Sequence, residues 1–199
     1  LSTREEYGVN LINDLTGRKA ELVLDPVFLL DKNQWLSLCN KSNNKEKYVF
    51  AYTNRSGQWE EFLQRTSYPM NSKKVYKISR HLTPKDFISR QVKVSYSISP
   101  VEFVETIANA ELVVSASFHC IAMSIILNIP FIAVLTGDRG KDERVLNILK
   151  IAGLENRILT SNTTSADVVS PIDYQLVEER LSKYITSSKD FLKHAIFSN

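Results

Sequence analysis

The fold of this chain is decided by an uncharged stretch at residues 112–137, which reads LVVSASFHCIAMSIILNIPFIAVLTG. The stretch is long enough to suggest a membrane-spanning helix, for which about 20 apolar residues suffice. Pro130 would break such a helix, however, and several serines and a histidine interrupt the apolar run. We therefore interpret the stretch as a strand over 112–115, a helix over 117–127 and a second strand over 130–135, all buried inside an α/β sheet.

The same alternation between helical and strand periodicity continues on both sides of this stretch. Further strands are expected over residues 21–24, 48–53, 74–78, 92–95 and 157–160. Further helices are expected over residues 3–15, 57–64, 100–109, 142–152 and 174–185, around residues 35–38 after an Asp31 cap, and as a short turn after Pro84. Strands that alternate with helices through short connections predict βαβ units, a mainly parallel sheet and helices on both faces. The prediction is a single Rossmann-like, doubly wound α/β domain over residues 1–199, with ligands at the carboxyl ends of the strands.

The net charge and its distribution bear on whether the chain binds nucleic acid. The chain has 25 Lys and Arg residues against 22 Asp and Glu residues, a net charge of +3. The basic residues are scattered and no nucleic-acid motif accompanies them, so no nucleic-acid partner is expected.

The two cysteines, Cys39 and Cys120, lie far apart, which is typical of a reducing, cytoplasmic setting. The histidines are not spaced as metal ligands, and we interpret His81 and His194 as surface residues. The polar opening at Leu1 is no signal peptide and suggests a fragment.

The first candidate site is the turn that joins the first strand of the uncharged stretch to its helix, Ser115-Ala116-Ser117-Phe118-His119. Small hydroxyl residues can cap free backbone N–H groups, and the N-terminus of a helix carries partial positive charge. Together these features predict an anion site suited to phosphate or carboxylate. In one interpretation His119 donates to that anion or acts as a general acid; in the other it is a buried histidine that holds the turn together.

The second candidate site is the segment TGDRGKDER at residues 136–144, which follows the next strand. It brings three basic side chains, Arg139, Lys141 and Arg144, to the same edge of the sheet, unless it is only a solvated loop that leads into a helix. Asp25 also follows a predicted strand, where it either binds ligand or shapes the Asp-Pro turn. The sequence contains no Walker A loop, GxSxG elbow, HExxH motif, EF-hand loop or GxGxxG fingerprint.

Short segments spread along the chain share an order and spacing with one known family. They are STREE at 2–6, ELVLDPVFLL at 21–30, VVSASFH at 113–119, SII at 124–126 with Asn128 and Pro130-Phe131, Arg144 ahead of NIL at 147–149, and GLENR at 153–157. On these segments the chain resembles the polysaccharide pyruvyl transferase family. The resemblance covers almost the whole chain but only the C-terminal half of the family. A full member has a preceding Rossmann-like domain, absent here, and its two domains resemble a GT-B glycosyltransferase with the active site between them.

The resemblance implies ketal transfer of a pyruvyl group from phosphoenolpyruvate to two hydroxyls of a sugar, with no cofactor. It implies an acceptor that is a sugar or lipid-linked glycan of bacterial exopolysaccharide biosynthesis, which would bring a cytoplasmic enzyme to the inner face of the membrane. His119 matches the family's histidine and would be the catalytic acid. The expected substrate-binding residues are Arg4, Ser117, Arg139, Lys141 and Arg144; for Arg144, which matches the family's helix-entry arginine, a structural role is the alternative. The isolated chain is expected to be inactive, because the acceptor contacts would lie on the other domain.

One position departs from the family's pattern: Cys120 stands where the family usually has glycine after the histidine. A side chain there could narrow or change the site. Two alternatives therefore stay open, a GT-B glycosyltransferase half that binds a nucleotide sugar, and an anion-binding module that has lost turnover. The acceptor sugar and the oligomeric state are not determined by the sequence.

Overall fold

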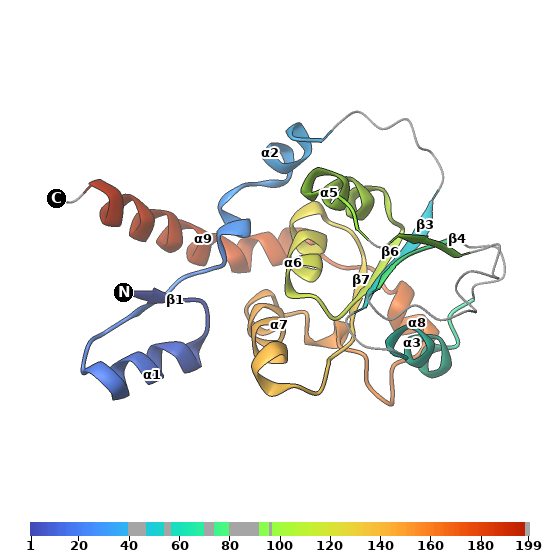
Figure 1. Cartoon of the computed structure of the whole chain (residues 1–199), viewed down its shortest axis with the longest axis horizontal. Coiled ribbons are helices and arrows are strands. Elements are labelled where there is room, and N and C mark those ends of the chain that lie inside the picture. Colours follow the sequence, from blue (N-terminus) through green and yellow to red (C-terminus); the bar gives the residue numbers. More distant parts are fainter. Residues whose placement is uncertain (40–46, 54–56, 70–73, 80–91, 96, 198–199) are drawn as a thin grey trace.

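A computed structural model describes residues 1–39, 47–53, 57–69, 74–79, 92–95 and 97–197. Among these residues, five parallel strands form the main sheet in the order β5–β4–β3–β6–β7 (Figure 1). Their bounds are β3 Tyr48–Thr53, β4 Lys74–Ser79, β5 Val92–Ser95, β6 Leu112–Ser115 and β7 Phe131–Ala133. The uncharged stretch supplies β6 and β7, and Val113 pairs with Phe50 on one side and Phe131 on the other. All three side chains are fully buried, which places this stretch at the centre of the core.

Helices cover both faces of this sheet. On one face α5 (Pro100–Asn109), α6 (Phe118–Leu127) and α7 (Arg139–Ala152) pack against alternate strand residues such as Phe50 and Val113. On the other face α3 (Gln58–Thr66) and α8 (Ser165–Val169) pack against the intervening residues, such as Val49 and Val114. Because successive side chains of a strand point to opposite faces, each strand contributes to both layers. The predicted doubly wound, mainly parallel α/β fold is confirmed.

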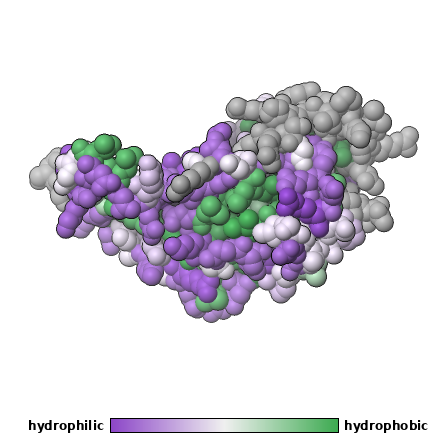
Figure 2. Space-filling view, turned by 90° about the horizontal axis from the view of Figure 1, so that it is seen from below, coloured by the Kyte–Doolittle hydropathy of each residue, from purple (hydrophilic) through white to green (hydrophobic). Residues whose placement is uncertain are grey.

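The N-terminal residues form a small unit beside the main sheet. It consists of β1 (Ser2–Thr3), α1 (Glu6–Thr16) and β2 (Glu21–Leu22), followed by the 3-10 helix η1 (Pro26–Leu29) and α2 (Lys32–Ser37). The two strands pair in parallel with each other. In Figure 1 this unit lies apart from the five-stranded sheet, and the long helix α9 (Tyr174–Phe197) runs past both. Apolar side chains are exposed at this end of the molecule, Leu15 and Phe197 among them. The face in Figure 2 is largely hydrophilic, with a further apolar patch near its middle.

Several local expectations are confirmed. The strands over residues 48–53, 92–95 and 112–115 have the expected bounds. Asp31 and Ser99 cap α2 and α5, each in a reciprocal capping box with the residue three positions on. Gly153 ends α7 in the left-handed conformation, with a φ of 68°.

Other elements differ from expectation, each for a local reason. The helix expected from residue 3 begins at Glu6, because Ser2–Thr3 is used as a strand against Glu21–Leu22. The helix expected from residue 142 begins at Arg139, because the Asp138 carboxylate caps it by accepting from the backbone N–H groups of Gly140 and Lys141. β2 and β7 are shorter than expected, and α9 continues to Phe197, well beyond residue 185.

Within the described part of the chain, residues 157–160 form no strand, which corrects the prediction. Arg157 ends the 3-10 helix η2 (Glu155–Arg157), and Ile158 makes a single bridge to Ala133. The Arg157 guanidinium donates to the backbone carbonyls of Asp167, Val168, Ser170 and Pro171, so this residue ties η2 to the segment of α8 and the residues after it. His81 and the helical turn expected after Pro84 lie outside the described residues, whereas His194 is exposed as predicted. None of the helices described is both long and apolar enough to cross a membrane.

Candidate functional site

The turn after β6 places His119 in the first turn of α6. The Ser115 hydroxyl closes this turn, donating to the Tyr52 carbonyl at 2.7 Å and accepting from the Ser117 N–H at 3.0 Å. Ser117 is the N-cap residue of α6, but its own side chain makes no capping hydrogen bond. The expected capping by a serine hydroxyl is therefore made by Ser115. The His119 side chain is 58% exposed, so it is not the buried histidine of the alternative interpretation.

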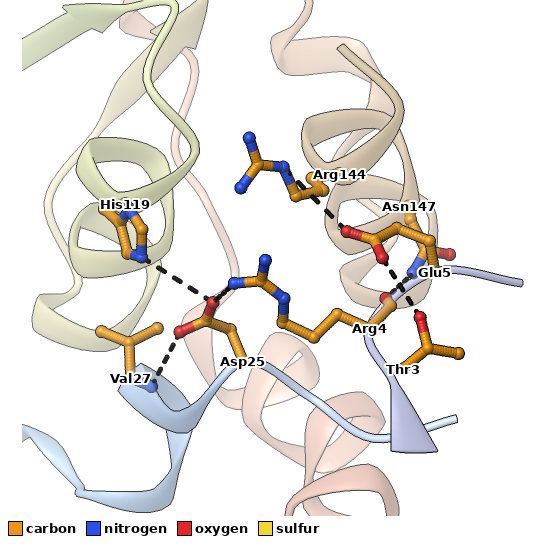
Figure 3. A network of polar contacts seen from close by, with 8 residues as sticks. All are labelled: Thr3, Arg4, Glu5, Asp25, Val27, His119, Arg144 and Asn147. Carbon is orange, nitrogen blue, oxygen red and sulfur yellow. Dashed lines mark hydrogen bonds and ion pairs between the residues drawn. The ribbon is translucent and has the colours of Figure 1, made fainter. Parts of the chain in front are cut away.

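The carboxylate that His119 faces belongs to Asp25, between β2 and η1. Its side chain is only 5% exposed, and its two oxygens have different partners (Figure 3). Oδ1 accepts from the Val27 N–H at 3.1 Å, which shapes the Asp-Pro turn. Oδ2 pairs with Nη1 of Arg4 and lies 3.7 Å from Nε2 of His119. One buried carboxylate oxygen therefore faces two side chains that are 115 residues apart in the sequence.

Arg4 is held in place through its backbone as well as its side chain. It directly follows β1, and its carbonyl accepts a hydrogen bond from the Asn147 amide of α7 at 3.2 Å. The pairing of β1 with β2 sets the position of this segment relative to Asp25. Helix α9 holds the turn that carries Asp25, because the Leu24 N–H donates to the buried Ser188 hydroxyl at 2.8 Å.

A second arginine, Arg144 of α7, completes the cluster. Its Nε lies 4.0 Å from Oε1 of Glu5, and its guanidinium carbon lies 5.9 Å from the centre of the Phe118 ring. Figure 3 shows Arg144 and Arg4 on the same side of the segment that carries Glu5, with His119 across from them on α6. The structure thus brings together Arg4, His119 and Arg144 from three different elements. We refer to these residues with Asp25 and Glu5 as the Arg4–His119 cluster.

The remaining predicted basic residues lie at the start of α7. Lys141 is exposed and pairs with Asp138 of the same helix turn at 3.0 Å. This bond with Lys141 is the main reason that the pKa of Asp138 is lowered. The loop before the helix is held by the buried Asp142, which accepts from the backbone of Thr136 and Gly137. Arg139 opens the helix, and its side chain lies outside the described part of the molecule. Lys141 therefore contacts Asp138, while Arg144 reaches the cluster.

Cys120 does not line the site. Its side chain is fully buried in the core cluster on the α6 face of the sheet. Burial raises the pKa of its thiol to about 12, so the reactive thiolate is scarce at neutral pH. The residue that replaces the family's usual glycine thus points into the protein, and its side chain does not narrow the space beside His119.

Within the cluster, Glu5 is not among the site residues that the sequence predicts, and Asp25 is one for which two interpretations stay open. The sequence poses ligand binding and turn formation as alternatives for Asp25. In the structure one oxygen pairs with Arg4 while the other shapes the turn. The available signal was an Asp-Pro after one strand and an Arg-Glu pair after the neighbouring strand. In the described residues, no group of three or more His, Cys, Asp or Glu side chains is placed to hold a metal ion.

The fold and the cluster together define an α/β protein with cationic side chains at the carboxyl end of a parallel sheet. A sequence model of the family described as polysaccharide pyruvyl transferase matches residues 1–138 of the 199. The chain therefore belongs to the polysaccharide pyruvyl transferase family. The matched part contains Arg4, Asp25 and His119, whereas Arg144 lies beyond it.

Solved structures support the fold. A crystal structure of Methanocaldococcus jannaschii UDP-GlcNAc 2-epimerase, in complex with UDP-GlcNAc and UDP, is 14% identical with a TM-score of 0.51. The alignment covers 93% of this chain and 54% of that one, so this chain spans about half the length of the epimerase. A glycotransferase of kitacinnamycin is 15% identical with a TM-score of 0.46, over 76% of this chain and 41% of that one. The likeness to the epimerase agrees with the doubly wound α/β fold described above. No curated protein matches the chain.

Proposed function

We propose that this chain is the phosphoenolpyruvate-binding half of a pyruvyl transferase that forms a ketal on a sugar of a surface polysaccharide or its precursor. The observation that carries the proposal is the convergence of Arg4, His119 and Arg144 at the start of α6. Membership of the family supports the general reaction. The donor, the acceptor and the roles of individual residues are the parts that we propose.

The two arginines of the Arg4–His119 cluster suit phosphoenolpyruvate, which carries a carboxylate and a phosphate. Guanidinium groups bind both anions with paired, directional N–H donors, and the cluster has two of them. The first turn of α6 adds backbone N–H groups and the positive end of the helix dipole. We assign Arg4 and Arg144 to these anions, with Ser117 at the helix N-terminus beside them. Arg139 and Lys141, one helix turn away on α7, are proposed for weaker, longer-range contacts.

His119 is proposed as the acid that starts the reaction. It would donate a proton to the methylene carbon of phosphoenolpyruvate, which makes the neighbouring carbon electrophilic. A sugar hydroxyl then forms a C–O bond to that carbon and loses its proton. A second hydroxyl of the same sugar then forms the other C–O bond as the C–O bond to phosphate breaks. The proton of the first hydroxyl restores His119, and the proton of the second leaves with inorganic phosphate. The exposed position of the imidazole is compatible with this role, because a proton donor must reach the substrate.

We propose a sugar or a lipid-linked glycan as acceptor, used in the cytoplasm and, for a lipid-linked glycan, at the inner face of the membrane. The alternative reaction is glycosyl transfer from a nucleotide-sugar donor, since the epimerase of similar fold was crystallised with UDP-GlcNAc and UDP.

Calorimetric titration of the full-length protein with phosphoenolpyruvate and, separately, with UDP-GlcNAc tests the proposed donor. Phosphoenolpyruvate should bind and should bind more weakly to Arg4→Ala, by about 10- to 100-fold if a charge-assisted contact of about 1.5–3 kcal/mol is lost. Arg18→Ala, which removes the same charge from the exposed connection after α1, is the matched control and should bind normally. Binding of UDP-GlcNAc alone would move the protein to the glycosyltransferase alternative.

A further inference from the structure

The buried carboxylate of Asp25 is an unusual component of a site for an anionic substrate. A negative charge beside the binding arginine repels phosphoenolpyruvate and lowers its affinity. Yet Asp25 is almost completely buried and directs one oxygen at both Arg4 and His119. Asp25 opposes the binding of phosphoenolpyruvate but contacts both Arg4 and His119. We therefore look for a role of Asp25 other than binding the substrate.

We propose that Asp25 is a positioning residue for pyruvyl transfer: its Oδ2 holds the Arg4 guanidinium and the His119 imidazole in fixed relation to one another. This inference rests on the proposed function. A substrate whose carboxylate or phosphate is bound by Arg4 then has its methylene carbon presented to His119. The arrangement orients the reacting groups, and misplacement by about 1 Å can cost about 100-fold in rate.

The two oxygens of Asp25 have different partners, so the proposed positioning role can be tested apart from a structural role. Oδ1 makes the turn by accepting from the Val27 N–H, and the backbone carbonyl of Asp25 accepts from the Phe28 N–H at 3.0 Å. Oδ2 makes only the contacts with Arg4 and His119 among those of the described residues. Asparagine can keep the first contact with its amide oxygen but places an NH₂ donor where Oδ2 lay. That donor faces the Arg4 guanidinium, which is itself a donor, and the negative charge that His119 faced is gone. Asp25→Asn should therefore preserve the turn and release Arg4 and His119.

The charged groups named around Asp25 come from three segments. Arg4 and Glu5 follow β1, His119 lies on α6, and Arg144 lies on α7 beside Glu5. Removal of the Asp25 charge leaves both arginines and only Glu5 in opposition. The electrostatic attraction for phosphoenolpyruvate therefore does not weaken in Asp25→Asn, whereas the alignment of donor and acid is lost.

The experiment measures phosphate release by the full-length protein at a series of phosphoenolpyruvate concentrations, with galactosides and mannosaminides as acceptors. Asp25→Asn should lower kcat by about 100-fold, the cost of a lost alignment, while KM for phosphoenolpyruvate stays the same or falls. Asp31→Asn is the matched control, because it makes the same chemical change at the exposed cap of α2, where asparagine also serves. Its kcat and KM should equal those of the wild type.

Thermal unfolding of the same variants shows whether the turn survives. Asp25→Asn should melt close to the wild type, and Asp25→Ala, which loses the turn contact as well, should melt lower. Wild-type kcat in Asp25→Asn would show that Asp25 only shapes the turn, and a raised KM at unchanged kcat would show a binding role; either overturns the inference while the proposed function stands. Absence of phosphoenolpyruvate-dependent phosphate release by the wild type overturns the proposed function and this inference with it.

Discussion

Replacement of Arg157 by methionine tests how the segment after α7 is held in place. Arg157 is 1% exposed, and its guanidinium donates to the backbone carbonyls of Asp167 at 3.1 Å, Ser170 at 2.6 Å and Pro171 at 3.3 Å. Burial lowers the pKa of Arg157, but arginine stays charged at neutral pH. Methionine keeps most of the buried apolar volume and removes every donor. The substitution therefore isolates the hydrogen bonds.

The expected loss follows from these contacts. A hydrogen bond from a charged donor contributes about 1.5–3 kcal/mol. The Val168 carbonyl, whose bond with Arg157 is buried, costs about a further 1–3 kcal/mol when it is left without a donor. The contributions within one network are not additive, so we expect a total of about 3–5 kcal/mol, as for other broken buried charge partnerships. That is a large fraction of the roughly 5–15 kcal/mol by which a domain is stable.

Urea denaturation followed by circular dichroism measures this loss. The control is Arg180→Met, because Arg180 is exposed and donates to the Ala152 carbonyl at 3.2 Å, a single contact expected to contribute about 1 kcal/mol. A loss below about 1 kcal/mol for Arg157→Met, or equal losses for the two variants, would refute the reasoning that these buried bonds hold the segment.

Three further results are expected. Ser188→Ala leaves the Leu24 N–H without its acceptor and should lower the free energy of unfolding by about 1–3 kcal/mol in the same urea assay, whereas Ser182→Ala at an exposed site should not; equal effects would contradict the role of Ser188. Arg144→Ala should raise KM for phosphoenolpyruvate about tenfold, as for a contact of about 1.4 kcal/mol, and Lys141→Ala by less, because Lys141 pairs with Asp138; the reverse order would contradict the assignment. Alkylation followed by mass spectrometry should label Cys39 before Cys120. The Cys120 thiol is fully buried, and its pKa of about 12 keeps it protonated at neutral pH. Fast labelling of Cys120 in folded protein would contradict its burial.

The parts of the fold that could be predicted are those with a local signal. The uncharged stretch at 112–137 and the capping residues Asp31 and Ser99 carry such signals within a few residues, and the structure confirms them. The strand expected at 157–160 was wrong because an apolar run next to Arg157 reads as a strand, while the hydrogen bonds that reshape it come from residues 167–171.

The site was only partly predictable for the same reason. The helix N-terminus after β6 identified His119 and Ser117 as neighbours of one turn, and the structure places both there. The meeting of Arg4 with Asp25 depends on β1 and β2, strands of two residues each, which are too short to show periodicity. The contacts of Asp25 with Arg4 and His119 therefore emerged only from the three-dimensional arrangement.

The most direct test of the proposed function is the release of phosphate and the formation of a sugar ketal by the full-length protein, with phosphoenolpyruvate as donor and galactosides or mannosaminides as acceptors. The account predicts turnover that falls by about 10²- to 10⁴-fold in His119→Gln, the usual contribution of a general acid. The same substitution at the exposed His194 of α9 should leave turnover unchanged. Undiminished turnover in His119→Gln, or phosphate release without a ketal product, would contradict the account.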